Sequence, residues 1–168
     1  MTPLTRVRHP ESSVRLPAQS WVGRTGREGF DRVAAFPLAK LMHGIGQPVG
    51  GVVADPVEHL PLLRATADEL QAAWVSEHLS FNRADLAGGA VESGFLLPPL
   101  QQPSGVRVAA RNIRAYRAAL GRPFAFETGV NYLQPEDLEM SDGEFWRGVA
   151  DGADCGVVLD LHNRGATS

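Results

Sequence analysis

The chain has 168 residues, which is enough for one domain with its own hydrophobic core. Hydrophobic residues make up 43% of it and charged residues 21%, as is ordinary for a soluble globular protein. The net charge of −3 argues against partners such as nucleic acid or an anionic membrane surface. The single cysteine, Cys155, excludes an internal disulfide and is typical of a reducing compartment.

No apolar run approaches the roughly 18 residues that a membrane-spanning helix needs. The N-terminus also lacks the apolar segment of a secretory signal, so we expect a cytoplasmic protein. Residues 1–36 are rich in Arg, Ser, Gly and Pro and show neither helical nor strand periodicity. We predict that this N-terminal segment is poorly ordered, or has weak local structure and diverges from the rest, and that residues 37–168 form the folded domain.

Short apolar runs within the predicted domain indicate strands, and polar side chains able to bind a metal stand at their ends. The runs cover residues 39–42, 74–79, 123–127 and 156–161. The side chains, in chain order, are His43, His78, Glu127 and Asp160, with His162 and Asn163 just beyond the last run. Residue types of this kind at successive strand ends suggest a metal site.

The segments between the predicted strands show helical patterns or a long loop. Amphipathic spacing predicts helices over residues 55–70 and 106–120. Ser141 and Glu144 predict a capping box at the start of a third helix. Residues 81–105 are interpreted as a long functional loop, whose apolar patch at residues 95–97 is expected to pack over a site or against a partner.

Strands that alternate with helices predict an α/β fold, with a parallel sheet covered by helices. Chemically active side chains at the carboxyl ends of several strands favour a TIM-type barrel, because that fold builds its sites there. A closed barrel needs eight βα units and typically about 250 residues. The predicted strands number about four, so we expect a partial TIM barrel, about half of the full fold.

Five motifs in order carry a family resemblance. They are His43-Gly44-Ile45-Gly46, Trp74-Val75-Ser76-Glu77-His78-Leu79-Ser80-Phe81-Asn82, Gly94-Phe95-Leu96-Leu97-Pro98-Pro99, Phe126-Glu127-Thr128-Gly129-Val130-Asn131-Tyr132 and Leu159-Asp160-Leu161-His162-Asn163. Through them, residues 43–163 resemble the family once called domain of unknown function 692. Its members are described as multinuclear non-haem iron-dependent oxidative enzymes.

The resemblance implies a TIM barrel of the xylose-isomerase-like type that holds two or three iron ions. It also implies an enzyme that uses dioxygen to modify cysteine-containing or related residues in ribosomally made peptides. A small partner protein that presents the peptide often accompanies such enzymes.

The family pattern implies specific metal ligands in this sequence. The candidates are His43, His78, Glu127 and Asp160, with His162 and Asn163 as further ligands or close neighbours of the metal. Glu127 is expected to bridge two metals, and imidazole with carboxylate is independently a ligand set that suits non-haem iron. Glu77 should point away from His78 by strand alternation and act as a supporting acid. The alternative for each histidine is a hydrogen-bonded core or surface residue.

Residues 1–36 and 164–168 depart from the family pattern, so the resemblance implies only about the N-terminal half of the barrel and an incomplete set of iron ligands. Three interpretations stay open. The chain is an oxidase completed by another chain or by self-association through an exposed sheet edge. It is a truncated and inactive family member. It is a metal- or sugar-binding module on an isomerase-like half-barrel. The sequence leaves undecided whether the 168 residues are an enzyme by themselves.

Overall fold

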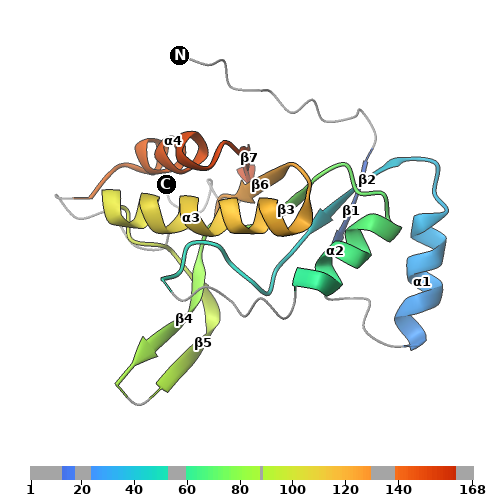
Figure 1. The fold of residues 1–168 in the computed structure, drawn as a ribbon, viewed down its shortest axis with the longest axis horizontal. Helices are drawn as coiled ribbons and strands as arrows, with labels where there is room; N and C mark the ends of the chain where they lie inside the picture. Colours follow the sequence, from blue (N-terminus) through green and yellow to red (C-terminus); the bar gives the residue numbers. More distant parts are fainter. Residues whose placement is uncertain (1–12, 18–23, 53–59, 88, 130–138, 162–168) are drawn as a thin grey trace.

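The structure is a computed structural model that describes residues 13–17, 24–52, 60–87, 89–129 and 139–161. Strands and helices follow one another along the chain (Figure 1). The strands are β1 (Ser13–Pro17), β2 (Ala39–His43), β3 (Val75–His78), β4 (Phe81–Leu86), β5 (Gly89–Leu97), β6 (Phe124–Glu127) and β7 (Gly156–Val158). The helices are α1 (Arg24–Ala34), α2 (Leu60–Glu69), α3 (Pro103–Leu120) and α4 (Asp142–Ala153).

Five of the strands form one parallel sheet in the order β1-β2-β3-β6-β7. A helix lies in every connection between sheet neighbours, as parallel pairing requires. Within the described residues the sheet is open, with β1 and β7 at its two edges. The predicted α/β fold is therefore confirmed as a partial TIM-like arrangement, with one parallel strand more than the sequence indicated.

The hydrophobic core lies between the sheet and the helices. Met42, Val75 and Phe126 alternate along their strands with the residues that face the other side, and all three are buried. They join one core cluster with residues of the helices, which include Ala67, Ile113, Tyr116, Phe145 and Val149. Full burial of a side chain such as Phe126 stabilises the fold by about 1.5–3 kcal/mol. The core thus fixes which face of each strand is turned toward the helices.

Local signals set the limits of two helices. Gly121 follows α3 with a left-handed backbone (φ 64°), and its N–H donates to the carbonyl of Arg117. Ser141 and Glu144 form the predicted capping box at the start of α4. The predicted start of the helix before β3, near residue 55, lies outside the described residues. No helix in the described part of the chain has the length and apolarity needed to cross a lipid bilayer.

Within residues 1–36, predicted to be poorly ordered or to have weak local structure, the structure describes a strand at residues 13–17 and a helix at residues 24–34. Strand β1 pairs with β2 over five residues, from Ser13 opposite Ala39 to Pro17 opposite His43. The hydrogen bonds that pair two strands are made by backbone groups. A short edge strand can therefore form without alternating apolar and polar side chains. Helix α1 buries Phe30 in the core, and the Arg27 guanidinium lies over its ring, 5.2 Å from the centroid. Tertiary contacts stabilise both elements where local periodicity is weak.

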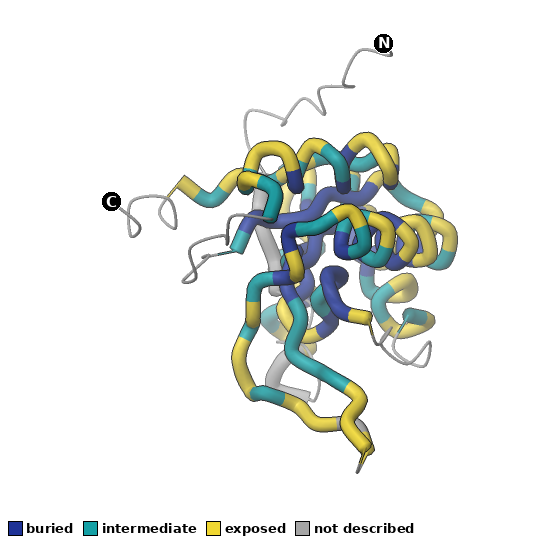
Figure 2. The backbone as a smooth tube through the Cα atoms, turned by 90° about the vertical axis from the view of Figure 1, so that its left-hand side faces the viewer, coloured by how far each residue is buried: buried dark blue, intermediate teal, exposed yellow. Residues whose placement is uncertain are grey.

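The prediction of a long loop over residues 81–105 is wrong. Strands β4 and β5 form an antiparallel hairpin that projects from the body of the molecule, and α3 begins at Pro103 (Figures 1 and 2). A register shift between Phe81 and Arg83 obscures the alternation in the sequence. The apolar patch is largely open, because Phe95 is 74% exposed.

Candidate metal centre

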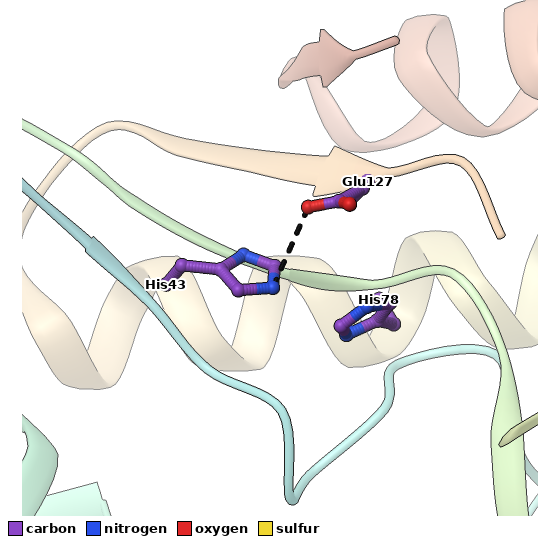
Figure 3. A group of neighbouring side chains, drawn as sticks. All are labelled: His43, His78 and Glu127. Atoms are coloured by element: carbon purple, nitrogen blue, oxygen red, sulfur yellow. Dashed lines mark ion pairs between the residues drawn. The ribbon is translucent and has the colours of Figure 1, made fainter. Parts of the chain in front are cut away.

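Three neighbouring strands end in residues that could bind a metal ion. His43 is the last residue of β2, His78 of β3 and Glu127 of β6. The register places His78 opposite Glu127, and His43 opposite Ser76, which shares a face with His78. This face is opposite to the one that packs against the helices. The parallel sheet therefore brings the three side chains to one place (Figure 3).

The three side chains lie within bonding range of a shared ion. One candidate ligand atom from each residue lies within 4.8 Å of the others. Nε2 of His43 is 3.4 Å from Oε2 of Glu127, and the two imidazole rings meet edge to face with centroids 4.8 Å apart. His43 and Glu127 are buried, and the His78 side chain is 17% exposed. A buried carboxylate needs a partner of opposite charge or a set of donors.

The residues present fit a divalent transition metal. Bonds from such an ion to nitrogen and oxygen are about 2.0–2.2 Å long, so two ligand atoms of one ion lie at most about 4.4 Å apart. Donor atoms within 4.8 Å reach that geometry by a small inward movement. Two histidines and one carboxylate with open positions are the ligand set of many non-haem iron oxygenases. The donor set of the cluster thus suits a divalent metal ion.

Ser76 is a site residue that the sequence analysis missed. Its hydroxyl lies 2.8 Å from Nδ1 of His43, across the β2–β3 pair, and both groups are buried. This contact leaves Nε2 of His43 to face Glu127. The signal was available, because Ser76 precedes His78 by two residues and so lies on the same face of β3.

Strand alternation predicted that Glu77 points away from His78, but its carboxylate contacts that residue. Its Oε1 accepts a hydrogen bond from the backbone N–H of His78 (2.9 Å) and lies 3.3 Å from Nδ1 of the same residue. The side chain leaves β3 on the opposite face, but at the end of the strand its carboxylate turns back over the backbone. Glu77 is therefore a close neighbour of the cluster through His78.

Asp160 lies near the same strand end but is not in the cluster that the described residues form. Val158 is the register partner of Glu127, so Asp160 stands two residues farther along the chain. Its backbone N–H donates to the hydroxyl of Thr128 at 3.2 Å. The remaining predicted ligands, His162 and Asn163, lie outside the described residues. Of the four candidate ligands that the structure describes, it brings together His43, His78 and Glu127.

Comparison with known proteins places this chain in a family. The family described as RiPP precursor modification enzyme MbnB/TglH/ChrH matches residues 15–167. The chain belongs to this family. The match confirms the resemblance seen in the motifs. It also covers residues 15–36 and 164–167, so the expectation that these residues depart from the family pattern is wrong. The family's description refers to enzymes that modify the precursors of RiPPs.

The chain is also similar to several UPF0276 proteins. The chain is 32% identical to a UPF0276 protein of Chromobacterium violaceum, over 88% of this chain and 55% of the relative. It is 31% identical to one of Pasteurella multocida (92% and 50%), and 33% identical to one of Vibrio vulnificus (72% and 40%). The chain therefore spans about half the length of the curated relatives it matches.

Proposed function

We propose that this chain carries part of the active site of a non-haem iron enzyme that oxidatively modifies a cysteine-containing peptide precursor. The observation that carries the proposal is the cluster of His43, His78 and Glu127 at three adjacent strand ends, in a chain of a peptide-modifying family. The sheet edge that holds the cluster is the one where TIM-type folds build their sites.

Each residue of the cluster has a distinct part in holding iron. The two imidazoles supply neutral nitrogen donors, and Glu127 supplies a negative charge that offsets part of the charge of a divalent ion. Ser76 holds His43 through Nδ1. When bound, ferrous iron supplies the one-electron chemistry with dioxygen that oxidative modification requires.

A centre of two or three ions needs donors beyond these three residues. We propose that His162, Asn163 and Asp160 contribute, and that the rest come from sequence corresponding to the other half of the relatives or from a second copy. A small protein that presents the peptide is part of the same proposal. It follows from the family resemblance.

Ferrous iron binding tests the proposal directly. The purified chain is titrated anaerobically with ferrous iron in competition with a chromophoric chelator. His78→Ala and Glu127→Gln should each lower the affinity at least about tenfold, because each removes a ligand. Glu28→Gln is the control, because Glu28 is an exposed carboxylate on α1. A wild-type chain that binds no ferrous iron overturns the proposal. So does equal affinity in His78→Ala, Glu127→Gln and the wild type.

A further inference from the structure

Glu77 has the surroundings of a positioning residue. The side chain is 3% exposed, and it comes from the residue directly before His78. Its two carboxylate oxygens have separate partners. Oε1 faces the backbone N–H and the Nδ1 of His78, and Oε2 accepts from the backbone N–H of Gln47 at 3.2 Å. The carboxylate thus joins the β2–α2 connection to the end of β3.

Two further residues, Gly44 and Tyr116, help to fix the position of this carboxylate. Gly44 provides the space, because a Cβ at this position would lie 2.2 Å from Oε2 of Glu77. The Tyr116 hydroxyl, on α3, donates to the side-chain oxygen of Gln47 at 2.8 Å. Gln47 and Tyr116 are both buried. A buried acid fixed by so many neighbours keeps one orientation toward the imidazole.

The contact with His78 has a chemical consequence. A carboxylate only accepts hydrogen bonds, so the Nδ1 that faces it must carry the proton of a neutral imidazole. We infer that Glu77 positions His78, holding it as the Nδ1–H tautomer so that Nε2 is the nitrogen left for a metal. Contacts between a carboxylate and the remote nitrogen of a metal-binding histidine orient the ring and raise its basicity. The inference rests on the proposed function for the identity of the metal.

Glutamine is an informative replacement at this position. Glu77 accepts on both oxygens, whereas an amide has one oxygen and one NH₂ group. Glu77→Gln must therefore leave either the N–H of Gln47 or the N–H groups of His78 without an acceptor. The volume of the side chain is unchanged, so the packing around Gly44 is retained.

The first test reads the tautomer in the metal-free chain. Long-range ¹H–¹⁵N spectra of the ¹⁵N-histidine-labelled protein are recorded at about pH 8, where an ordinary imidazole is neutral. The signal lost in His78→Ala assigns His78. We expect Nδ1 to be protonated in the wild type, and Glu77→Gln to shift the population toward Nε2–H. A wild-type His78 that carries its proton on Nε2 overturns the inference, even if the variant does not fold.

The second test measures ferrous iron affinity in the same anaerobic competition. We expect Glu77→Gln to weaken binding about 10–100-fold and Glu28→Gln to leave it unchanged. Unchanged affinity in a folded Glu77→Gln protein also overturns the inference. The two failures are distinguishable. A wild-type chain without iron contradicts the proposed function, whereas iron binding with a protonated Nε2 contradicts only the role of Glu77.

Discussion

Two consecutive residues of β3 each contact one histidine of the candidate metal site. Ser76 contacts His43 on the neighbouring strand, and Glu77 contacts His78 beside it. Two consecutive residues thus hold both imidazoles by Nδ1, although strand alternation sends their side chains to opposite faces. The local sequence Ser-Glu-His combines the two orienting groups with one of the candidate ligands.

Cys155, in contrast, is a partly buried thiol whose surroundings disfavour the thiolate. Burial raises the pKa of its thiol to about 12, the nearby Arg117 lowers it, and Asp154 raises it further. The unfolded chain releases this proton above its ordinary pKa of about 9, whereas the folded chain retains it up to about 12. The unfolded state therefore binds fewer protons in this window, and the free energy of unfolding must fall as the pH rises.

We expect that fall to be at most about 1.4 kcal/mol per pH unit above pH 9. Urea unfolding between pH 7 and 10 measures it, with Cys155→Ala as the comparison. The variant should lose the part of the alkaline slope that belongs to the thiol. Identical pH dependence in both proteins would show that Cys155 titrates alike in the folded and unfolded states.

At the scale of elements, the first turn of α3 packs closely against the residues just before the helix. A Cβ on Gly105 would lie 1.9 Å from the carbonyl oxygen of Leu100, a backbone atom that cannot rotate away. The ring of Phe145, on α4, would lie 3.4 Å from the same Cβ. The first turn of α3 is thus set against both the end of the hairpin segment and α4.

We expect Gly105→Ala to lower the free energy of unfolding by about 1–3 kcal/mol, the usual cost of overpacking. Gly143→Ala is a matched helical control, because nothing lies within 4 Å of a Cβ there. It should leave stability unchanged or raise it by up to about 1 kcal/mol through helix propensity. Urea or thermal unfolding of the two variants provides the measurement. Equal effects would contradict the proposed packing constraint.

At the scale of the whole molecule, the open sheet is the main feature. The described residues leave β1 and β7 as edges, and Val157, Leu159 and Leu161 near the second edge are exposed. Exposed apolar side chains beside an unpaired strand favour association. The same residues bring together three donor groups, enough for one ion.

We expect the 168-residue polypeptide alone to self-associate and to hold no more than one tightly bound iron per chain. A symmetric dimer would cover the edges but would duplicate the same ligands. Anaerobic purification with ferrous iron, followed by iron analysis, mass measurement in solution and thermal unfolding, gives the answer. A monomer with a cooperative transition and two or more tightly bound irons would contradict this expectation.

The sequence determined the features that depend on local pattern and residue chemistry. Apolar runs and amphipathic spacing predicted the α/β class, and the positions of β2, β3, β6 and α3 follow them closely. Imidazoles and carboxylates at strand ends predicted a metal site at one sheet edge. Parallel strands end at one edge of a sheet, so this inference required no distances.

Tertiary structure decided the features that depend on register and on contacts between distant residues. Pairing with β2 makes a strand of residues 13–17, which have no distinctive pattern of their own. Strand register brings His43, His78 and Glu127 together and leaves Asp160 two residues farther along. The orientation of Glu77 follows from the space at Gly44 and the N–H of Gln47, which lie about 30 residues away in sequence. Side-chain periodicity carries no information about such contacts, because they arise only when separate segments pack against each other.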